Sequence, residues 1–438
     1  MSEIKKENKT KGGNYFISNY PPFSFWSSDV VPEAIKVLSL PPKGDTPLGL
    51  YIHIPFCRKR CRFCYFKVYT GVDSEQVNSM SDSLVAELAL YAQQPFIGDR
   101  KLDFIYFGGG TPSFLSTKQL ISLTDRLKAI LPWDSATEIA FECEPGTLTE
   151  SKLKCIKDIG VTRLSLGVEN FKDEILETNG RAHRSKEVGR SYAFARSLGF
   201  EQINIDLISG MIGETDTNWR DCVDKVIEMA PESVTIYQME VPFNTKIYHE
   251  MKTDDTASCP VADWPTKRGW VDYAFKQLEK KGYDIGSAYT AIKDKSKTKF
   301  IYRDRLWQGA DMIALGVASF SHIGGAHFQN EKDLQPYQNS VKDGNIPIAR
   351  AMQPTEEERQ VREFILQLKR GRISCSYFKK KYDLDVLSYF ETPLKTLSDE
   401  KMLSTTEHEI ILSRKGLLQV DRFLPLFYLD KHKNARYA

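Results

Sequence analysis

Three cysteines, Cys57, Cys61 and Cys64, lie within the segment CRKRCRFCYF. A closed structural zinc site normally takes four ligands, in two pairs that are separated along the chain. Three thiolates are therefore one too few for such a site. A 4Fe-4S cluster that is held by only three thiolates keeps one iron free to bind a small molecule. The spacing of the cysteines favours a cluster of this kind over zinc.

The segment around the cysteines is also rich in cationic and aromatic side chains. The cations are Arg58, Lys59, Arg60 and Arg62. A cluster with three thiolates carries net negative charge, so nearby cations fit it, although each of them could equally be a solvated loop residue. We expect Phe63 and Phe66 to exclude water from the cluster, which would help to set its reduction potential.

The composition of the 438-residue chain is that of an ordinary globular protein, with 41% hydrophobic and 27% charged residues. Its formal charge of +2 gives no overall attraction to nucleic acid or to an anionic membrane surface. The sequence contains no apolar run of about 18 residues and no N-terminal signal peptide. We therefore expect a cytoplasmic protein without membrane insertion, in which thiols stay reduced.

Short apolar runs that are typical of β-strands recur from Leu48 onward, and most are separated by segments long enough for a helix. The runs are LGLYIHI, LDFIYF, EIAFECEP, VTRLSLGV, QINIDLISG, SVTIYQMEV, YDIGSAY and MIALGVASF. After QINIDLISG, Thr215 can cap a helix in which Trp219 and Val223 repeat at helical spacing. Such units in series predict an α/β fold, with a parallel sheet closed wholly or partly into a TIM-type β/α barrel. The cysteines follow the first run, and functional residues of this architecture lie at the carboxyl ends of the strands.

Three regions of the sequence differ in composition and pattern. Residues 1–47 predict an N-terminal arm, polar and Lys-rich at its start and therefore partly disordered. Residues 48–353 contain the strand and helix units. Residues 354–438 predict a small, mainly helical, winged-helix-like domain. Winged helices can bind DNA, but no basic recognition helix stands out here, so we do not expect nucleic acid as a partner.

Five ordered sequence blocks accompany the strands. They are YIHIPFC, YFGGGTPSFL, FECEPGTL, RLSLGVENF followed by GRAH, and NIDLISGM. Together with the cysteine spacing, they resemble the radical S-adenosylmethionine (radical SAM) superfamily and, within it, the oxygen-independent coproporphyrinogen III oxidase family. That family has haem chaperones and class C methyltransferases among its relatives. The resemblance extends from about Leu48 to the end of the chain.

The resemblance implies a 4Fe-4S cluster on Cys57, Cys61 and Cys64, with S-adenosylmethionine bound to the open iron. Reductive cleavage of that molecule would give a 5′-deoxyadenosyl radical, which abstracts hydrogen from the substrate. The implied substrate is a tetrapyrrole or another conjugated compound of porphyrin and haem metabolism. No second cluster motif is present in the sequence, so an external one-electron donor such as flavodoxin or ferredoxin is implied as a partner.

The resemblance also assigns residues to the cofactor. Contacts with S-adenosylmethionine are implied for Tyr51, Phe63, Gly109, Gly110, Thr111 and Glu142. A second S-adenosylmethionine, which this family can hold, would contact Gly110, Thr111, Glu169, Arg181 and Asp206. Glu169 stands where the family usually has glutamine, so the second site would gain a negative charge. The alternative reading of Glu169 and Arg181 is a simple ion pair.

Three functions stay open on the sequence. They are a coproporphyrinogen oxidase-type decarboxylation, a methylation or cyclopropanation that uses two S-adenosylmethionines, and haem delivery by a chaperone. Phe66 replaces a fourth cysteine of the authentic oxidases. The segment KFIYRDRLWQGAD keeps Tyr302 and Trp307 of the chaperones' haem motif but lacks its His-Asn pair. His322 and His327 are the nearest candidates for a haem ligand.

Overall fold

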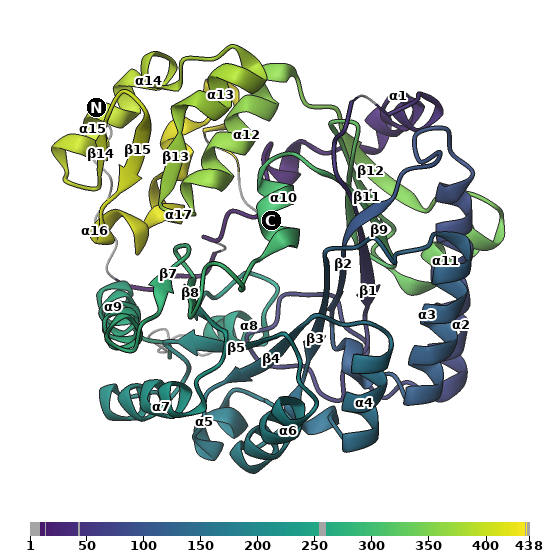
Figure 1. The fold of residues 1–438 in the computed structure, drawn as a ribbon, viewed down its shortest axis with the longest axis horizontal. Helices are drawn as coiled ribbons and strands as arrows, with labels where there is room; N and C mark the ends of the chain where they lie inside the picture. Colours follow the sequence, from purple (N-terminus) through teal and green to yellow (C-terminus); the bar gives the residue numbers. More distant parts are fainter. Residues whose placement is uncertain (1–8, 14, 43, 254–259, 434, 436–438) are drawn as a thin grey trace. The chain divides into compact units, whose positions relative to one another are not determined.

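The computed structural model describes residues 9–13, 15–42, 44–253, 260–433 and 435 (Figure 1). The chain divides into two compact units. The core unit comprises residues 26–207 and 299–353. The second unit comprises residues 208–298 and 354–438, together with the chain up to Phe25, as far as these residues are described. The three regions expected from the sequence stay a prediction.

A parallel sheet forms the centre of the core unit. Its strands lie in the order β9-β1-β2-β3-β4-β5, and each pairs in parallel with its neighbours. The strands are β1 (Leu48–Ile54), β2 (Leu102–Gly109), β3 (Glu138–Cys143), β4 (Arg163–Glu169), β5 (Gln202–Ser209) and β9 (Asp311–Leu315). Antiparallel strands continue the sheet from β9, namely β10 (Phe320–Ile323), β11 (Ala326–Asn330) and β12 (Ile348–Met352).

Helices connect the parallel strands, which confirms the predicted α/β class. The helices of the core unit are α1 (Val31–Ala34), α2 (Ser74–Ala92), α3 (Thr117–Ile130), α4 (Glu150–Asp158), α5 (Asp173–Thr178), α6 (Ser185–Ser197), α10 (Ile301–Trp307) and α11 (Leu334–Lys342). Helices α2 and α3 lie side by side against the sheet (Figure 1). Each begins with a reciprocal pair of hydrogen bonds between its first residues, Asp73 with Gln76 and Ser116 with Gln119.

The register of the sheet brings the ends of its strands together. Tyr51 of β1 lies opposite Tyr106 of β2, and Phe107 of β2 lies opposite Phe141 of β3. Every residue of β1 except Tyr51 is buried. Because neighbouring strands run in parallel, their carboxyl ends meet at one edge of the sheet. The loops that follow β1, β2, β3 and β4 are therefore neighbours in space.

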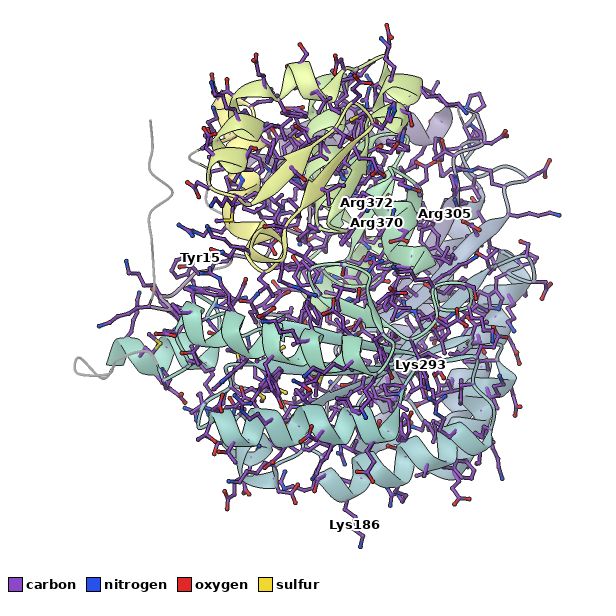
Figure 2. All side chains as sticks on the ribbon, turned by 60° about the vertical axis from the view of Figure 1, so that its left-hand side comes forward. Tyr15, Lys186, Lys293, Arg305, Arg370 and Arg372 are labelled. Carbon is purple, nitrogen blue, oxygen red and sulfur yellow. The ribbon has the colours of Figure 1, made fainter. Side chains whose placement is uncertain are left out.

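Helix α6 shows how the helices of the core unit divide into an apolar and a polar face. Val188, Tyr192 and Ala195 are buried. Figure 2 shows Lys186, in the first turn of α6, pointing away from the protein. In the part of the chain that is described, no helix combines the length and the apolar character that crossing a bilayer requires.

The second unit is mainly helical. Its elements are α7 (Asp216–Met229), β6 (Ser233–Gln238), α8 (Lys246–Thr253), α9 (Trp264–Lys280), β7 (Asp284–Ile285), β8 (Thr290–Ile292), α12 (Glu356–Leu368), β13 (Arg372–Ser374), α13 (Cys375–Tyr382), α14 (Val386–Tyr389), α15 (Glu391–Asp399), β14 (Leu403–Thr405), β15 (Glu409–Leu412), α16 (Arg414–Leu417) and α17 (Val420–Phe423). Thr215 caps α7 by accepting from the backbone N–H of Asn218, as predicted. Beyond Pro354, helices surround a small antiparallel sheet of order β13-β15-β14, so the expected mainly helical C-terminal region is confirmed.

The described part of the N-terminal arm up to Phe25 packs within the second unit, whereas the part from Trp26 onward belongs to the core unit. Thr10 donates from Oγ1 to the carbonyl of Ala262 at 2.8 Å, and Gly13 forms a β-bridge with Val241. Ile17 is buried. Residues 1–8, where the sequence predicts disorder, lie outside the described residues.

Candidate functional site

The three cysteines occupy the loop that follows β1, at the carboxyl edge of the sheet. Backbone hydrogen bonds close the base of this loop, from Cys57 N to Tyr69 O at 3.0 Å and from Tyr69 N to Pro55 O at 2.8 Å. Within the loop, Cys64 N donates to Cys61 O at 3.2 Å. We call residues 57–69 the cysteine loop. Its own backbone holds the three thiols on one short turn of chain.

The three thiols are half-buried and none forms a disulfide. Burial raises the pKa of Cys57 to about 11 and the pKa of Cys64 to about 12, so both are neutral thiols until a metal takes their protons. Among the described residues, no three His, Cys, Asp or Glu side chains converge on a single metal ion. A 4Fe-4S cluster binds each thiolate through a different iron and does not need such convergence. The donor set therefore fits a cluster.

A glycine turn at the end of β2 lies directly against the strand that leads into the cysteine loop. Gly109 has φ +108°, and a Cβ there would lie 2.6 Å from the His53 ring. A Cβ on Gly110 would lie 2.9 Å from the carbonyl oxygens of Ile54 and Phe56. Gly110 N also donates to Ile54 O at 2.8 Å. Only glycine allows this close approach of two backbone segments.

Glu142, near the end of β3, faces the glycine turn. Tyr106 donates from its hydroxyl to Glu142 Oε1 at 2.6 Å, and Gly109 N donates to Oε2 at 3.2 Å. Burial raises the pKa of Glu142 to about 7. A Cβ on Gly108 would lie 3.0 Å from the Tyr51 hydroxyl and 3.1 Å from Glu142 Oε2. The sequence-predicted residues Tyr51, Gly109 and Glu142 are thus gathered around one turn.

A second polar group follows at the ends of β4 and β5. Arg181 Nη2 lies 3.6 Å from Glu169 Oε1, and both side chains are 12% exposed. Glu169 has φ +64°, beside an irregularity in the β4–β5 pairing, and burial raises its pKa to about 7. Asp206 accepts from Ser165 Oγ at 2.9 Å and from Asn204 Nδ2 at 2.8 Å. The ion pair expected as an alternative for Glu169 and Arg181 is present.

Two contacts tie these groups to the cysteine loop. Cys57 Sγ lies 3.3 Å from Thr111 Oγ1. Arg181 donates from Nη1 to Cys61 Sγ at 3.4 Å. The residues that the resemblance assigned to the cofactor thus form one continuous region from the cysteines to the end of β4.

The aromatic residues of the loop differ from one another in exposure. Phe63 is half-buried. Phe66 is 46% exposed, and its ring lies 4.4 Å from the ring of Tyr65, which is itself 39% exposed. Phe66 therefore lies against another surface side chain, and the shielding of the cysteines that we expected from it is not present.

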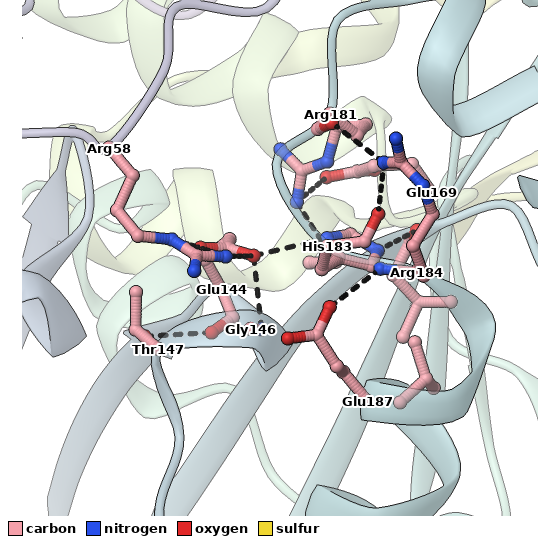
Figure 3. Close-up of polar contacts among 12 residues, drawn as sticks. Arg58, Glu144, Gly146, Thr147, Glu169, Arg181, His183, Arg184 and Glu187 are labelled. Carbon is pink, nitrogen blue, oxygen red and sulfur yellow. Dashed lines mark hydrogen bonds and ion pairs between the residues drawn. The ribbon is translucent and has the colours of Figure 1, made fainter.

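One group of residues that contacts the cysteine loop was not expected from the sequence. Arg58 donates from Nε to Glu144 Oε2 and from Nη2 to Glu144 Oε1, both at 3.0 Å. His183 Nδ1 lies 3.3 Å from Glu144 Oε1, so Arg58 and His183 approach Glu144 from opposite sides (Figure 3). Burial alone would raise the pKa of Glu144, but His183 and Arg58 outweigh it and hold the pKa at about 2. Arg58 was expected from the sequence only as one of several cations, and nothing in the sequence indicated that it pairs with Glu144.

The two histidines that were candidates for a haem ligand lie in the interior of the core unit. His322 is 6% exposed and His327 is 1% exposed. Their rings lie 4.7 Å apart, and the ring of Trp26 stacks on His327. His322 Nδ1 is 2.8 Å from the carbonyl oxygen of Ala310. Both imidazole rings are thus packed against other interior groups in this structure.

A family model described as the Radical SAM superfamily matches residues 51–226. This part of the chain is a radical SAM domain. It contains the cysteine loop, the glycine turn and every residue that the resemblance assigned to the cofactor. Radical SAM domains work with a 4Fe-4S cluster and S-adenosylmethionine, so the expected cofactors are confirmed. A second S-adenosylmethionine stays a prediction.

Relatives along the whole chain carry two different names. The haem chaperone HemW of Bacillus subtilis is 29% identical over 373 residues, which cover 84% of this chain and 96% of that protein. The oxygen-independent coproporphyrinogen III oxidase of Helicobacter pylori is 28% identical over 369 residues, which cover 81% and 79%. The solved structure of coproporphyrinogen III oxidase from Escherichia coli shares the fold, with a TM-score of 0.80 and 24% identity over 94% of this chain and 96% of that one. The chain that contains the radical SAM domain is thus similar over most of its length both to oxidases and to haem chaperones.

Proposed function

We propose that this protein is a radical SAM enzyme that acts on a tetrapyrrole or a similar conjugated substrate of porphyrin and haem metabolism. The observation that carries the proposal is the convergence of three free thiols, a glycine turn and the Glu142 carboxylate at one edge of a parallel sheet. The names of the relatives support the substrate class, since they are coproporphyrinogen III oxidases and haem chaperones.

The site residues divide into two groups by what they would hold. Cys57, Cys61 and Cys64 would ligate the cluster. Tyr51, Phe63, Gly109, Gly110, Thr111 and Glu142 would surround S-adenosylmethionine. When it is bound to the open iron and reduced by an external donor such as flavodoxin or ferredoxin, this cofactor supplies the radical chemistry that removes hydrogen from a substrate. The chain itself positions the ligand at the strand ends.

Glu142 has the properties of a ligand-binding carboxylate. With a pKa of about 7 it is partly ionised at neutral pH, and Tyr106 and the Gly109 amide fix the position of its two oxygens. In this state it can accept a hydrogen bond from a ribose hydroxyl or from an amino group. Proximity to the glycine turn would place that acceptor beside the bound cofactor.

The proposal is tested with the full chain after anaerobic reconstitution with iron and sulfide. Formation of 5′-deoxyadenosine under strong reductant, or with reduced flavodoxin, is the expected result, and the Cys61→Ser variant should form none. Product analysis with coproporphyrinogen III and with haem then identifies the substrate. If the reconstituted protein holds a full cluster but cleaves no S-adenosylmethionine with any of these donors and substrates, the enzymatic proposal is wrong.

A methyl transfer that uses two S-adenosylmethionines is the second candidate. The observation that favours it is the second polar group of Glu169, Arg181 and Asp206, which lies next to the first set of site residues. Formation of S-adenosylhomocysteine together with 5′-deoxyadenosine would support this reaction over decarboxylation. Stable haem uptake without turnover would instead support a chaperone, a name that two of the relatives carry.

A further inference from the structure

We propose that Glu144 is a positioning residue for the cysteine loop: with Arg58 and Gly146 it forms a latch that holds the loop in the shape that retains its iron–sulfur cluster. The inference rests on the cysteines holding a cluster, but it does not depend on which reaction the cluster supports. Figure 3 shows the residues of the latch.

The first element of the latch is a two-pronged ion pair next to a cysteine. Arg58 directly follows Cys57, and its Nε and Nη2 each donate to a different oxygen of Glu144 at 3.0 Å. Such paired, charge-assisted hydrogen bonds fix the orientation of both side chains. Glu144 is nearly buried at 9% side-chain exposure, whereas Arg58 is 39% exposed. A flexible side chain from the loop is thus anchored on a rigid site.

The second element is the rigidity of Glu144 itself. It caps the short 3-10 turn η5 (Pro145–Thr147), and its Oε1 accepts from Gly146 N at 3.0 Å. Its backbone N donates to Ser113 Oγ at 3.1 Å, and its carbonyl accepts from Thr147 Oγ1 at 2.8 Å. The Glu144 backbone is therefore held by its own turn and by Ser113 of the neighbouring loop, and its carboxylate is held by the Gly146 amide, independently of Arg58.

The third element is the space beside Gly146 in that turn, which the Arg58 guanidinium occupies. A Cβ on Gly146 would lie 2.1 Å from Arg58 Nη2 and 2.8 Å from Glu144 Oε1. Gly146 does not have a positive φ, so its backbone conformation is open to alanine. The absence of a side chain at Gly146 is thus explained by the ion pair that occupies the space, and an alanine there would displace the paired side-chain groups rather than the backbone.

The latch complements a separate attachment in the middle of the loop. Arg62 N donates to Asn179 O at 3.0 Å, and Arg62 Nη1 donates to Thr178 O at 3.0 Å. These contacts hold the part of the loop between Cys61 and Cys64. Arg58 and Glu144 supply the corresponding attachment for the part that begins at Cys57. The two attachments together restrain the segment that carries the three sulfur atoms.

The test compares cluster retention in full-length variants after anaerobic reconstitution. Glu144→Gln removes the ion pair, and Gly146→Ala pushes Arg58 Nη2 and Glu144 Oε1 out of their paired positions while both charges are kept. We expect each to speed the release of iron to a ferrous chelator by on the order of tenfold. The double variant should lose iron no faster than the faster single variant, since both act on one contact. Asp82→Asn is the matched control, because Asp82 pairs with Arg126 at 2.6 Å on the exposed surface of the same unit.

Two further measurements separate a latch from a general loss of stability. The melting temperature of the cluster-free protein should stay unchanged in Gly146→Ala, while the EPR signal of its reduced cluster broadens. Arg58→Lys keeps the charge but cannot form the paired contact, so it should release iron as fast as Arg58→Gln. If Glu144→Gln does not fold, the rate of iron release from Gly146→Ala, compared with the wild-type protein, tests the inference. Wild-type iron release in Gly146→Ala, or in Arg58→Lys, would overturn the inference, whereas loss of S-adenosylmethionine cleavage alone would bear only on the proposed function.

Discussion

The guanidinium of Arg181 joins the cysteine loop to the carboxylate of Glu169. Its Nη1 donates to Cys61 Sγ at 3.4 Å, and its Nη2 lies 3.6 Å from Glu169 Oε1. One cation therefore faces both a sulfur ligand and the second polar group of the site. A substitution of Arg181 should therefore affect the cluster as well as a ligand bound at the second polar group.

Substitution of Arg181 by glutamine should lower the midpoint potential of the cluster. A cation and N–H donor beside a cluster sulfur stabilises the more negative, reduced state. Its removal is expected to shift the potential by on the order of 50 mV, close to a tenfold change in a one-electron equilibrium. An anaerobic redox titration followed by EPR measures the shift. Arg181→Lys should shift it less, and equal potentials in all three proteins would contradict the prediction.

Each of the cysteines Cys57, Cys61 and Cys64 should be indispensable for the cluster. A serine in place of any one of them leaves only two thiolates, so iron content after reconstitution should fall to near zero. Cys375, a half-buried thiol of the second unit, supplies the control, since Cys375→Ser should retain the full iron content. Iron and sulfide analysis, together with the visible absorbance of the cluster, decides. A full cluster in any of the three loop variants would refute the assignment.

The buried ion pair of Glu138 and Arg163 should be a large contributor to the stability of the core unit. The two side chains are 2% and 4% exposed and share two hydrogen bonds at 3.1 and 3.3 Å. Glu138 also accepts from the backbone N–H groups of Ile301 and Tyr302 at the start of α10. Glu138→Ala leaves a buried cation unpaired and should cost roughly 3–5 kcal/mol. Urea unfolding of the cluster-free protein measures this, with Asp82→Asn as a surface control that should cost less than about 1 kcal/mol.

Glu142 should make the stability of the cluster-free protein fall as the pH rises. Its pKa is raised by burial from its ordinary value to about 7, so the folded state binds this proton more tightly than the unfolded state does. The stabilising effect of the neutral form is complete below about pH 4 and is lost as the pH rises to about 7. Relative to the Glu142→Gln variant, the wild-type protein should therefore lose roughly 1–3 kcal/mol between pH 5 and pH 8. Parallel pH profiles for the two proteins would contradict the predicted protonation.

Gly109→Ala should disrupt the glycine turn. The backbone of Gly109 has φ +108°, and the new methyl group would lie 2.6 Å from the His53 ring. The expected cost is at least about 2 kcal/mol, with loss of S-adenosylmethionine binding. Gly189, inside α6, is the matched control, because nothing lies within 4 Å of a Cβ there and alanine should stabilise the helix by up to about 1 kcal/mol. Thermal melts compare the stability of the two variants, and equilibrium dialysis compares their binding of S-adenosylmethionine. Equal stability and equal binding would contradict the prediction.

The sequence predicted the elements that follow from local patterns. The parallel strands were visible as apolar runs, and Thr215 was visible as a helix cap. The run MIALGVASF was expected as one strand, but β9 ends at Leu315 and the last residue of the run, Phe320, begins β10, which is antiparallel to β9. The chain turns at Gly316, which has φ +105°, and Ala318, which has φ +59°. Hydrophobic pattern alone cannot distinguish one long buried strand from two short ones.

The residues of the site also divide into those that local sequence reveals and those that only the folded chain brings together. Cysteines and glycines that lie close together in the sequence were identified from their spacing. The contact between Arg58 and Glu144 could not be identified in this way, because 86 positions separate the two residues and only the register of β1, β2 and β3 brings them together. The exposure of Phe66 was also hidden, since a phenylalanine beside cysteines suggests burial but the loop turns its ring outward.

The distant attachments of the cysteine loop have a consequence for the order of events in the cell. Arg58 is held by Glu144, and Cys61 is contacted by Arg181, a residue 120 positions further along the chain. During translation the three thiols leave the ribosome long before their supports exist. The contacts of the loop with Glu144 and Arg181 can form only after β3, β4 and the segment that carries Arg181 have been made, so we expect a stably held cluster only after this part of the sheet has folded. In a zinc finger the ion organises the polypeptide, whereas here we expect the folded sheet to support the cluster.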